Sequence, residues 1–250
     1  MYRALLFYMI FLLLPAMVEG ASLADTISMV KPSVVGVGTY LPTRRPPNLL
    51  IGTGFVVHRG QYVLTNNHIV AGALKVEKGE RLVVFTGEGM NSKALKAKVV
   101  GKDEVHDLAV LRISSTLPGL ELDEGPLARE GESVAFTGFP IGAVLGLYPV
   151  THRGMISSIT PIAVPAPSLS QLSAQKISRL RTPDLVYQLD GTAYPGNSGS
   201  PLYNPETGTV IGIVNMVHVK ITKEDILSKP SGISYAIPIE HARKLLGSLP

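Results

Sequence analysis

Residues 191–202 read Gly-Thr-Ala-Tyr-Pro-Gly-Asn-Ser-Gly-Ser-Pro-Leu and set Ser198 among small residues and turn formers. Glycine adopts backbone conformations that other residues reach only with strain, so Gly196 and Gly199 permit a sharp turn here. We expect this turn to point the amides of Gly196 and Ser198 at one spot. Backbone N–H donors placed in this way stabilise the negative oxygen of a tetrahedral intermediate. The stretch therefore predicts a nucleophilic Ser198 and an oxyanion hole formed by Gly196, Asn197 and Ser198.

Two upstream segments supply the partners that a serine nucleophile needs. Residues 64–72 read Leu-Thr-Asn-Asn-His-Ile-Val-Ala-Gly and place His68 just beyond a predicted strand. Residues 105–111 read Val-His-Asp-Leu-Ala-Val-Leu and place Asp107 at the start of another. A serine hydroxyl is a weak nucleophile until a base removes its proton, and histidine can do so near neutral pH. A carboxylate fixes the tautomer of that histidine and stabilises its cation. We therefore predict that His68, Asp107 and Ser198 form a catalytic triad.

The order of these residues favours one architecture. Taken singly, each has a structural interpretation, as a core histidine, a strand-end cap or a turn serine. Together they occur in the order His, Asp, Ser, which is the order of chymotrypsin-type triads. Two fall in the N-terminal half and the third in the C-terminal half, which suits a cleft between two barrels. An α/β-hydrolase is excluded, because its order is Ser, acid, His and its elbow needs glycine where Ser200 stands.

The chain offers no pattern typical of a metal site. It contains six histidines and no cysteine, and no pair of histidines has the His-Glu-x-x-His spacing. We expect no metal and no cofactor. The five histidines outside the triad are interpreted as structural or solvent-facing: His58, His106, His152, His218 and His241.

The remaining sequence reads as many short strands separated by turn residues. This spacing, without long helical periodicity, favours an all-β fold of barrels or sandwiches. The predicted strands cover residues 34–40, 52–58, 61–65, 81–85, 95–100, 108–113, 133–136, 155–159, 185–189, 210–219 and 234–237.

Three segments depart from the strand pattern. Residues 114–129 have no clear period and predict a linker between two halves of similar size. Residues 161–183 are rich in proline and predict an irregular surface loop, with room for a short helix at 169–180. Apolar residues at helical spacing from Ile239 to Leu246 predict one helix at the end of the chain.

The N-terminus has the layout of a secretory signal. Met1-Tyr2-Arg3 is positively charged, residues 4–17 are uncharged and largely apolar, and small residues follow. The apolar run is shorter than the roughly 20 residues that span a bilayer. We predict a signal peptide over residues 1–20, cleaved near Gly20, and a periplasmic or secreted protein without stable membrane insertion. An uncleaved membrane anchor is the alternative.

Composition narrows the class of protein further. The 250-residue chain has a formal net charge of +4, and its basic residues are scattered rather than clustered. A nucleic-acid partner is therefore unsupported. The absence of cysteine argues against a lipoprotein and against the disulfide-rich extracellular proteases of animals, and it favours a bacterial exported protein.

On these motifs the sequence resembles the protease domain of the HtrA/DegP group of trypsin-like serine proteases. The resemblance runs from about Val34 to the end and rests on residues 52–55, 62–68, 107–111, 195–199 and 232–238. It implies two six-stranded antiparallel β-barrels of the chymotrypsin type with a C-terminal helix, over residues 21–118 and 119–250. It also implies that residues 138–142 border the oxyanion hole. Ser200 departs from the second glycine that is usual there, and we expect no regulation by a PDZ domain in this chain.

The same resemblance implies how substrate is held. A strand formed by Asn215, Met216 and Val217 would pair with extended substrate backbone. The primary pocket would be lined by Thr192, Ala193 and Tyr194. Because Thr192 carries no charge, we expect a small or medium apolar side chain before the cleaved bond rather than Lys or Arg. A pocket that prefers Glu, built with His218, is the competing interpretation.

The function that follows is a serine endopeptidase acting through an acyl-enzyme on unfolded or extended protein substrates, in protein quality control. The resemblance also implies a homo-oligomer, a trimer in many members. The alternative is a protease fold with low turnover that serves as a binding or chaperone-like protein.

Overall fold

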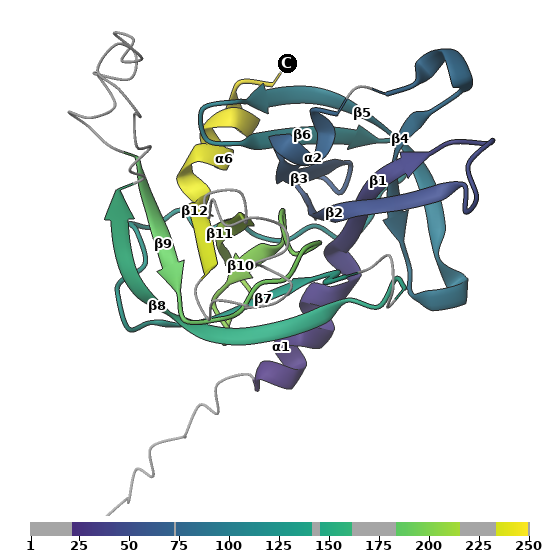
Figure 1. Cartoon of the computed structure of the whole chain (residues 1–250). Coiled ribbons are helices and arrows are strands. Elements are labelled where there is room, and N and C mark those ends of the chain that lie inside the picture. The colour runs from purple at the N-terminus through teal and green to yellow at the C-terminus, as the bar shows by residue number, and fades with distance from the viewer. Residues whose placement is uncertain (1–21, 73, 142–145, 162–183, 216–233, 250) are drawn as a thin grey trace, which may run out of the picture.

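The computed structural model describes residues 22–72, 74–141, 146–161, 184–215 and 234–249. Their strands close into two six-stranded antiparallel barrels, which confirms the predicted fold class (Figure 1). The first barrel comprises β1 (Val34–Tyr40), β2 (Asn48–Val57), β3 (Tyr62–Asn66), β4 (Arg81–Thr86), β5 (Lys93–Asp103) and β6 (Leu108–Ile113). The second comprises β7 (Ser133–Gly138), β8 (Val150–Pro161), β9 (Leu185–Leu189), β10 (Pro201–Tyr203), β11 (Val210–Asn215) and β12 (Ser234–Pro238).

Both barrels use the same strand order. The first closes as β1-β2-β3-β6-β5-β4, and the second, followed from β7, closes as β7-β8-β9-β12-β11-β10. The pairing of β3 with β6 in the first barrel therefore corresponds to that of β9 with β12 in the second. In the first barrel this pairing brings the short helix α2 (Asn67–Val70), which follows β3, beside the start of β6.

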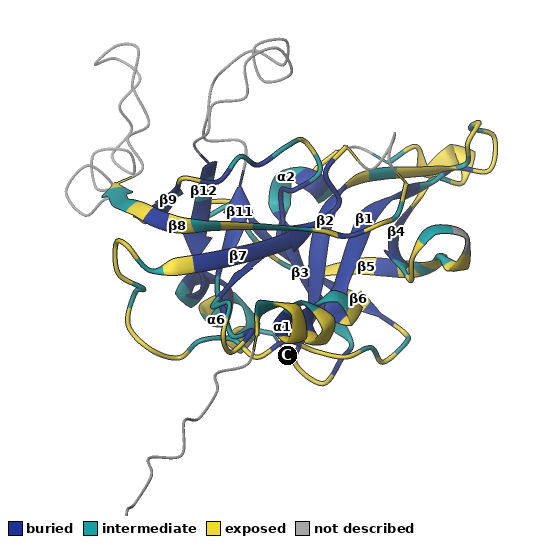
Figure 2. Cartoon of the chain, turned by 90° about the horizontal axis from the view of Figure 1, so that it is seen from below, coloured by how far each residue is buried: buried dark blue, intermediate teal, exposed yellow. Residues whose placement is uncertain are grey.

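Three apolar cores hold the barrels together. One fills the first barrel, one fills the second, and a third lies between them. Along β2, Val56 faces the interior of the first barrel, whereas its neighbours Phe55 and Val57 belong to the core between the barrels. Strands at the junction are thus buried on both faces, which explains their continuous apolar runs (Figure 2).

Helices occur mainly at the two ends of the described chain. Helix α1 (Leu23–Val30) precedes the first barrel, and its N-cap Ser22 accepts a hydrogen bond from the amide of Asp25. Helix α6 (Ile239–Gly247) follows the second barrel. Short 3₁₀ helices lie at Lys31–Ser33, Val76–Lys78 and Gly89–Asn91.

Each terminal helix contacts the barrel that is farther from it along the chain. Helix α1 precedes the first barrel and reaches the second, and helix α6 follows the second barrel and reaches the first. The hydroxyl of Thr26 in α1 reaches the carbonyl oxygen of Glu206 in the second barrel, at 3.4 Å. Helix α6, yellow in Figure 1, runs from the second barrel to β5 and β6 of the first. The two terminal helices thus brace the two barrels together.

Several short elements were not predicted from the sequence. They include helix α1, although Ser22 followed three residues later by Asp25 resembles a helix-start signal. The short helix α2, the 3₁₀ helices and strand β10, which directly follows the Ser198 turn, were missed as well. The C-terminal helix was predicted correctly. Of the predicted loop at 161–183, Pro161 is the last residue of β8 and the remainder lies outside the described residues, as do the predicted signal at 1–20 and residues 216–233.

Candidate active site

His68 and Asp107 lie side by side at one edge of the first barrel. Because β3 and β6 pair with Asn66 opposite Leu108, the residues that follow β3 and precede β6 meet. The Nδ1 atom of His68 is 2.6 Å from Asp107 Oδ2, and the backbone amide of His68 donates to Asp107 Oδ1 at 2.8 Å. Two contacts with one carboxylate fix both the position and the orientation of the imidazole.

Hydrogen bonds to the main chain hold Asp107 in an uncommon backbone conformation. Its φ is +55°, a region that costs a residue with a side chain about 1–2 kcal/mol and that aspartate tolerates better than most. Its carbonyl oxygen accepts hydrogen bonds from the backbone amide of Asn67 at 2.9 Å and from the side-chain amide of Asn66 at 3.1 Å. These bonds keep the carboxylate turned towards His68.

A residue of the second barrel binds the same carboxylate. Asn215, the last residue of β11, is fully buried, and its Nδ2 donates to Asp107 Oδ2 at 2.8 Å. From the sequence, Asn215 was expected only in a substrate-pairing strand, and this contact was not foreseen. A buried amide needs a hydrogen-bond partner, but only the three-dimensional arrangement reveals that the partner is Asp107.

Ser198 lies in the sharp turn expected from its flanking glycines. The φ angles are +102° at Gly196 and +86° at Gly199, in the region that favours glycine. A Cβ atom on Gly196 would lie 2.2 Å from the carbonyl oxygen of Phe139, and one on Gly199 would lie 2.0 Å from that of Thr53. Both positions therefore require glycine.

The junction between the barrels brings this turn close to the segment that carries His68. The carbonyl oxygen of Ser198 accepts a hydrogen bond from the amide of Thr53 in the first barrel, at 2.9 Å. A Cβ atom on Gly52 would lie 2.5 Å from the side chain of Ile69, the neighbour of His68, and 3.1 Å from the carbonyl oxygen of Ser198. Gly52 thus permits the close approach of the two segments.

Two hydrogen bonds orient the peptide groups just before Ser198, and a third holds the hydroxyl of Thr53 that makes one of them. The hydroxyl of Thr53 donates to the carbonyl oxygen of Gly196 at 2.6 Å and accepts from the amide of Phe139 at 3.0 Å. The amide of Ile141 donates to the carbonyl oxygen of Pro195 at 2.7 Å. Since the N–H and C=O groups of a trans peptide point in opposite directions, the bond to Pro195 turns the amide of Gly196 away from Ile141.

The three residues predicted to form the oxyanion hole differ in whether their backbone amides donate a hydrogen bond within the protein. Within the part of the chain that the structure describes, the amides of Gly196 and Ser198 donate no hydrogen bond, so both are available to an anion. The amide of Asn197 instead donates to the carbonyl oxygen of Tyr194 at 2.9 Å. Asn197 therefore closes the turn, and its neighbours offer the two free donors.

The predicted pocket residues lie beside the core of the second barrel. Ala193 is buried in that core, whereas Thr192 and Tyr194 are half-buried. The nearest acid along the chain, Asp190, is exposed and accepts a hydrogen bond from the amide of Met155 at 2.6 Å. Met216, Val217 and His218 lie outside the described residues.

His152 packs against the second barrel, in line with the structural role that the sequence allowed for it. Its ring stacks on Phe136 at a centroid distance of 4.8 Å and lies 6.2 Å from the ring of Tyr194. Burial lowers the pKa of His152 below its ordinary value, because the cationic form loses hydration. His152 is thus a neutral, largely apolar neighbour of Tyr194 near pH 7.

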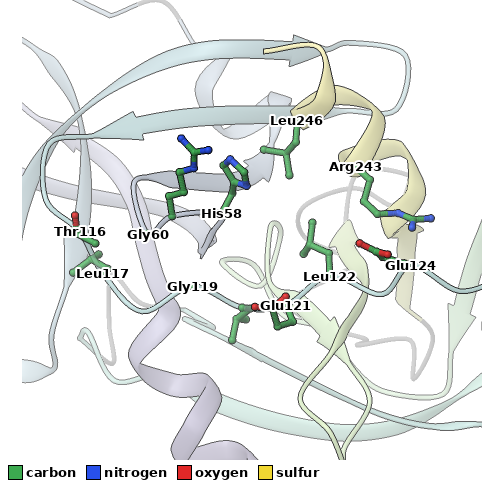
Figure 3. Close-up of a pocket in the computed structure, with 12 residues that line it drawn as sticks. His58, Gly60, Thr116, Leu117, Gly119, Glu121, Leu122, Glu124, Arg243 and Leu246 are labelled. Atoms are coloured by element: carbon green, nitrogen blue, oxygen red, sulfur yellow. The ribbon is translucent and has the colours of Figure 1, made fainter. Parts of the chain in front are cut away.

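A cavity of about 640 Å³ lies away from these residues (Figure 3). It opens at the turn between β2 and β3, where His58 and Gly60 lie, at the opposite end of β3 from His68. Figure 3 shows Arg243 and Leu246 of α6 on its other side. This cavity has no part in the site around Ser198.

The described residues contain neither a candidate metal site nor a membrane-spanning helix. No group of three or more His, Asp or Glu side chains among them could hold a metal ion. No helix in the same part of the chain is long and apolar enough to cross a membrane.

Comparison with known families agrees with this geometry. Residues 52–213 match the model of the trypsin-like peptidase domain. A DegP-like protein of Hahella chejuensis, named a periplasmic serine endoprotease, is 34% identical over 199 residues, which cover 79% of this chain and 35% of that protein. The serine protease Do-like HtrA of Bacillus subtilis is 27% identical over 250 residues, which cover 92% of this chain and 49% of that protein. The chain thus spans less than half the length of these relatives.

Solved structures show the same relationship. A serine endoprotease from Yersinia pestis is similar with a TM-score of 0.64 and 25% identity, over 91% of this chain and 66% of that one. An HtrA-type protease solved with a tripeptide is similar with a TM-score of 0.65 and 25% identity, over 91% of this chain and 63% of that one. The resemblance to the HtrA/DegP group is confirmed.

Proposed function

Because the chain belongs to the trypsin-like peptidase domain family, we propose that it is a serine endopeptidase whose catalytic residues are Ser198, His68 and Asp107. The observation that carries the proposal is the contact of His68 Nδ1 with Asp107 Oδ2 at 2.6 Å. Since this contact occupies Nδ1, it leaves Nε2 of the neutral imidazole as the acceptor for the proton of a serine hydroxyl.

The reaction proceeds in two stages. The Oγ atom of Ser198 attacks the scissile carbonyl carbon while His68 takes its proton, and the carbonyl oxygen becomes negatively charged. The amides of Gly196 and Ser198 stabilise that oxygen. His68 then gives its proton to the leaving amine as the C–N bond breaks, which leaves an acyl-enzyme. Water activated by His68 hydrolyses the ester and restores Ser198.

The substrates proposed are unfolded or extended proteins. An extended backbone can add to the segment that begins at Asn215 and continues through Met216 and Val217. A pocket formed by Thr192, Ala193 and Tyr194 contains no acid, so a small or medium apolar side chain should precede the cleaved bond. Burying Lys or Arg there would leave a charge without a partner.

The setting proposed is protein quality control outside the cytoplasm. The positively charged start and apolar run of residues 1–20 support a signal peptide cleaved near Gly20. The periplasmic name of the Hahella relative supports the same compartment. We also propose that the mature protein is a homotrimer. Analytical sedimentation, which measures the mass of the assembly, tests this oligomeric state.

The decisive experiment is the cleavage of unfolded casein by the wild type and by two variants. We expect Ser198→Ala to lower turnover by about 10⁶-fold, as in subtilisin. We expect Asp107→Asn to lower it by about 10⁴-fold through the wrong imidazole tautomer. Near-normal turnover by Asp107→Asn would remove Asp107 from the mechanism. A folded wild-type protein that binds casein without cleaving it would favour the chaperone-like alternative.

A further inference from the structure

Behind Asp107, at the junction of the two barrels and α6, lies a group of ionisable side chains that the proposed mechanism does not use. Asp103 ends β5, and His106 directly precedes Asp107. Asp184 directly precedes β9 of the second barrel, and His241 belongs to α6. These four residues therefore come from three separate parts of the fold.

The imidazole of His106 lies between two carboxylates. Its Nδ1 is 2.5 Å from Asp103 Oδ2, and its Nε2 is 3.3 Å from Asp184 Oδ1. A neutral imidazole has one donor and one acceptor nitrogen, so only the cation can donate to both carboxylates at once. In its cationic form, His106 joins the loop of the first barrel to the start of β9 in the second.

Asp103 organises the turn that leads to the triad. Its Oδ1 accepts hydrogen bonds from the amides of Val105 at 3.0 Å and His106 at 3.1 Å. Burial opposes the charge on Asp103, but the hydrogen bonds from His106 and Val105 outweigh it and lower the pKa of this carboxyl. The turn is therefore built around an ionised Asp103.

Helix α6 covers the other face of His106. The rings of His106 and His241 stack with centroids 3.8 Å apart and planes 21° from parallel. Burial, and then the charge of His106, lower the pKa of His241. On α6, Glu240 lies 3.6 Å from His241 Nε2, and Lys244 opposes the protonation of His241. His241 thus packs as a neutral ring against the imidazole of His106.

We propose that His106 is a positioning residue for Asp107, which it holds in place by tying the Asp103–Asp107 turn to Asp184 of the second barrel. The proposal rests on the proposed role of Asp107 as the catalytic carboxylate. Asp107 has a φ of +55°, a conformation that persists only where its surroundings hold it. Asn66 and Asn67 hold the carbonyl side of Asp107, and His106 anchors the residue on its other side.

The test compares His106→Gln, Asp184→Asn and a matched control, His58→Gln, which replaces an exposed histidine at the turn between β2 and β3. Since a misplacement of 1 Å can cost a hundredfold in rate, we expect the first two variants to lower kcat about tenfold, with KM nearly unchanged. The control should retain the wild-type kcat. Circular dichroism should show all four proteins folded at the assay temperature.

The split between kcat and KM separates positioning from a loss of substrate binding. A misplaced Asp107 lowers kcat and kcat/KM together and leaves KM nearly unchanged, because the contacts with substrate stay in place. An unchanged kcat in both variants would overturn the proposal.

An NMR measurement distinguishes failure of this inference from failure of the proposed function. The ¹⁵N shift of His68 Nδ1 reports its hydrogen bond to Asp107 whether or not the protein cleaves peptides. We expect that shift to move in His106→Gln and Asp184→Asn but not in His58→Gln. If the wild type is inactive and the shift moves, only the proposed function fails. If the wild type is active and the shift stays unchanged in both variants, the positioning role is wrong.

Discussion

Asn215 and Asp107 form a hydrogen bond that crosses from one barrel to the other. Asn215 Nδ2 donates at 2.8 Å to Asp107 Oδ2, the same oxygen that lies 2.6 Å from His68 Nδ1. Asp107 Oδ1 accepts from the amide of His68 at 2.8 Å. The carboxylate therefore has donors on both oxygens, and its position depends on how the two barrels sit against each other.

Asn215→Ala should weaken catalysis without unfolding the protein. A hydrogen bond to a charged group contributes about 1.5–3 kcal/mol, so its loss should lower kcat/KM roughly tenfold to a hundredfold. Steady-state kinetics on a chromogenic peptide measures this effect. Asn48→Ala, at an exposed position on β2, serves as the matched control and should keep wild-type kinetics. Equal kinetics for the two variants would mean that Asn215 does not support Asp107.

Thr53→Val should damage the oxyanion turn. The substitution keeps the shape of the side chain but removes the hydroxyl that bridges the carbonyl of Gly196 and the amide of Phe139. Each buried polar group left without a partner costs about 1–3 kcal/mol, so both the unfolding free energy and kcat should fall. Thr53→Ser keeps the hydroxyl and should retain most of the activity. Urea unfolding and single-turnover kinetics measure the two effects, and a fully active Thr53→Val would show that the bridge is dispensable.

Two histidines should make the folded state less stable in mild acid. The pKa values of His152 and His241 are both lowered, in each case first by burial. The unfolded chain therefore takes up protons near the ordinary histidine pKa of about 6.5, whereas the folded chain does so only at lower pH. The contribution of these two residues to the unfolding free energy is therefore complete above a pH of about 6.5. It is lost as the pH falls through the lowered pKa values of the folded state.

Thermal unfolding at a series of pH values from 7.5 to 5 tests this sign. The wild-type midpoint should fall with pH, and the double variant His152→Phe/His241→Phe should show a shallower fall. His58→Phe, at an exposed histidine, should follow the wild type. If the unfolding midpoint of the double variant falls with pH as steeply as that of the wild type, groups other than His152 and His241 cause the acid sensitivity.

Helix α1 should contribute to the stability of the whole unit. Val30 at its end is fully buried in the core between the barrels. Val30→Ala removes two buried methyl groups and should lower the unfolding free energy by about 2 kcal/mol. Val76→Ala, at a residue that is 68% exposed, should change it by less than about 0.5 kcal/mol. A similar stability for the two variants in urea unfolding would mean that α1 does not brace the barrels.

Most strands could be predicted because a short run of neighbouring residues is enough to indicate each one. Residues 34–40, 108–113 and 185–189 match β1, β6 and β9 residue for residue, since each is a short apolar run bounded by turn residues. The strand β10 was missed because its three residues form too short a run beside the Ser198 turn. Helix α1 was missed because its eight residues, rich in apolar side chains, follow directly on the apolar N-terminal segment.

Within the candidate site, residue type and order identified the groups but not their supports. Histidine, aspartate and serine in that order are recognisable because the chemistry restricts which residue types can serve. The contacts of Asn215 with Asp107 and of Thr53 with Gly196 join residues more than a hundred positions apart. No local pattern encodes such pairs, since they depend on the packing of one barrel against the other.

Mapping the site of fluorophosphonate labelling tests the central claim most directly. The reagent forms a covalent bond with a serine only where a base activates the hydroxyl and an oxyanion hole receives the phosphonyl oxygen. We expect one adduct per chain, located by mass spectrometry on Ser198, and none in Ser198→Ala or His68→Ala. A folded wild-type protein that stays unlabelled, or that carries the adduct on another serine, would contradict the account.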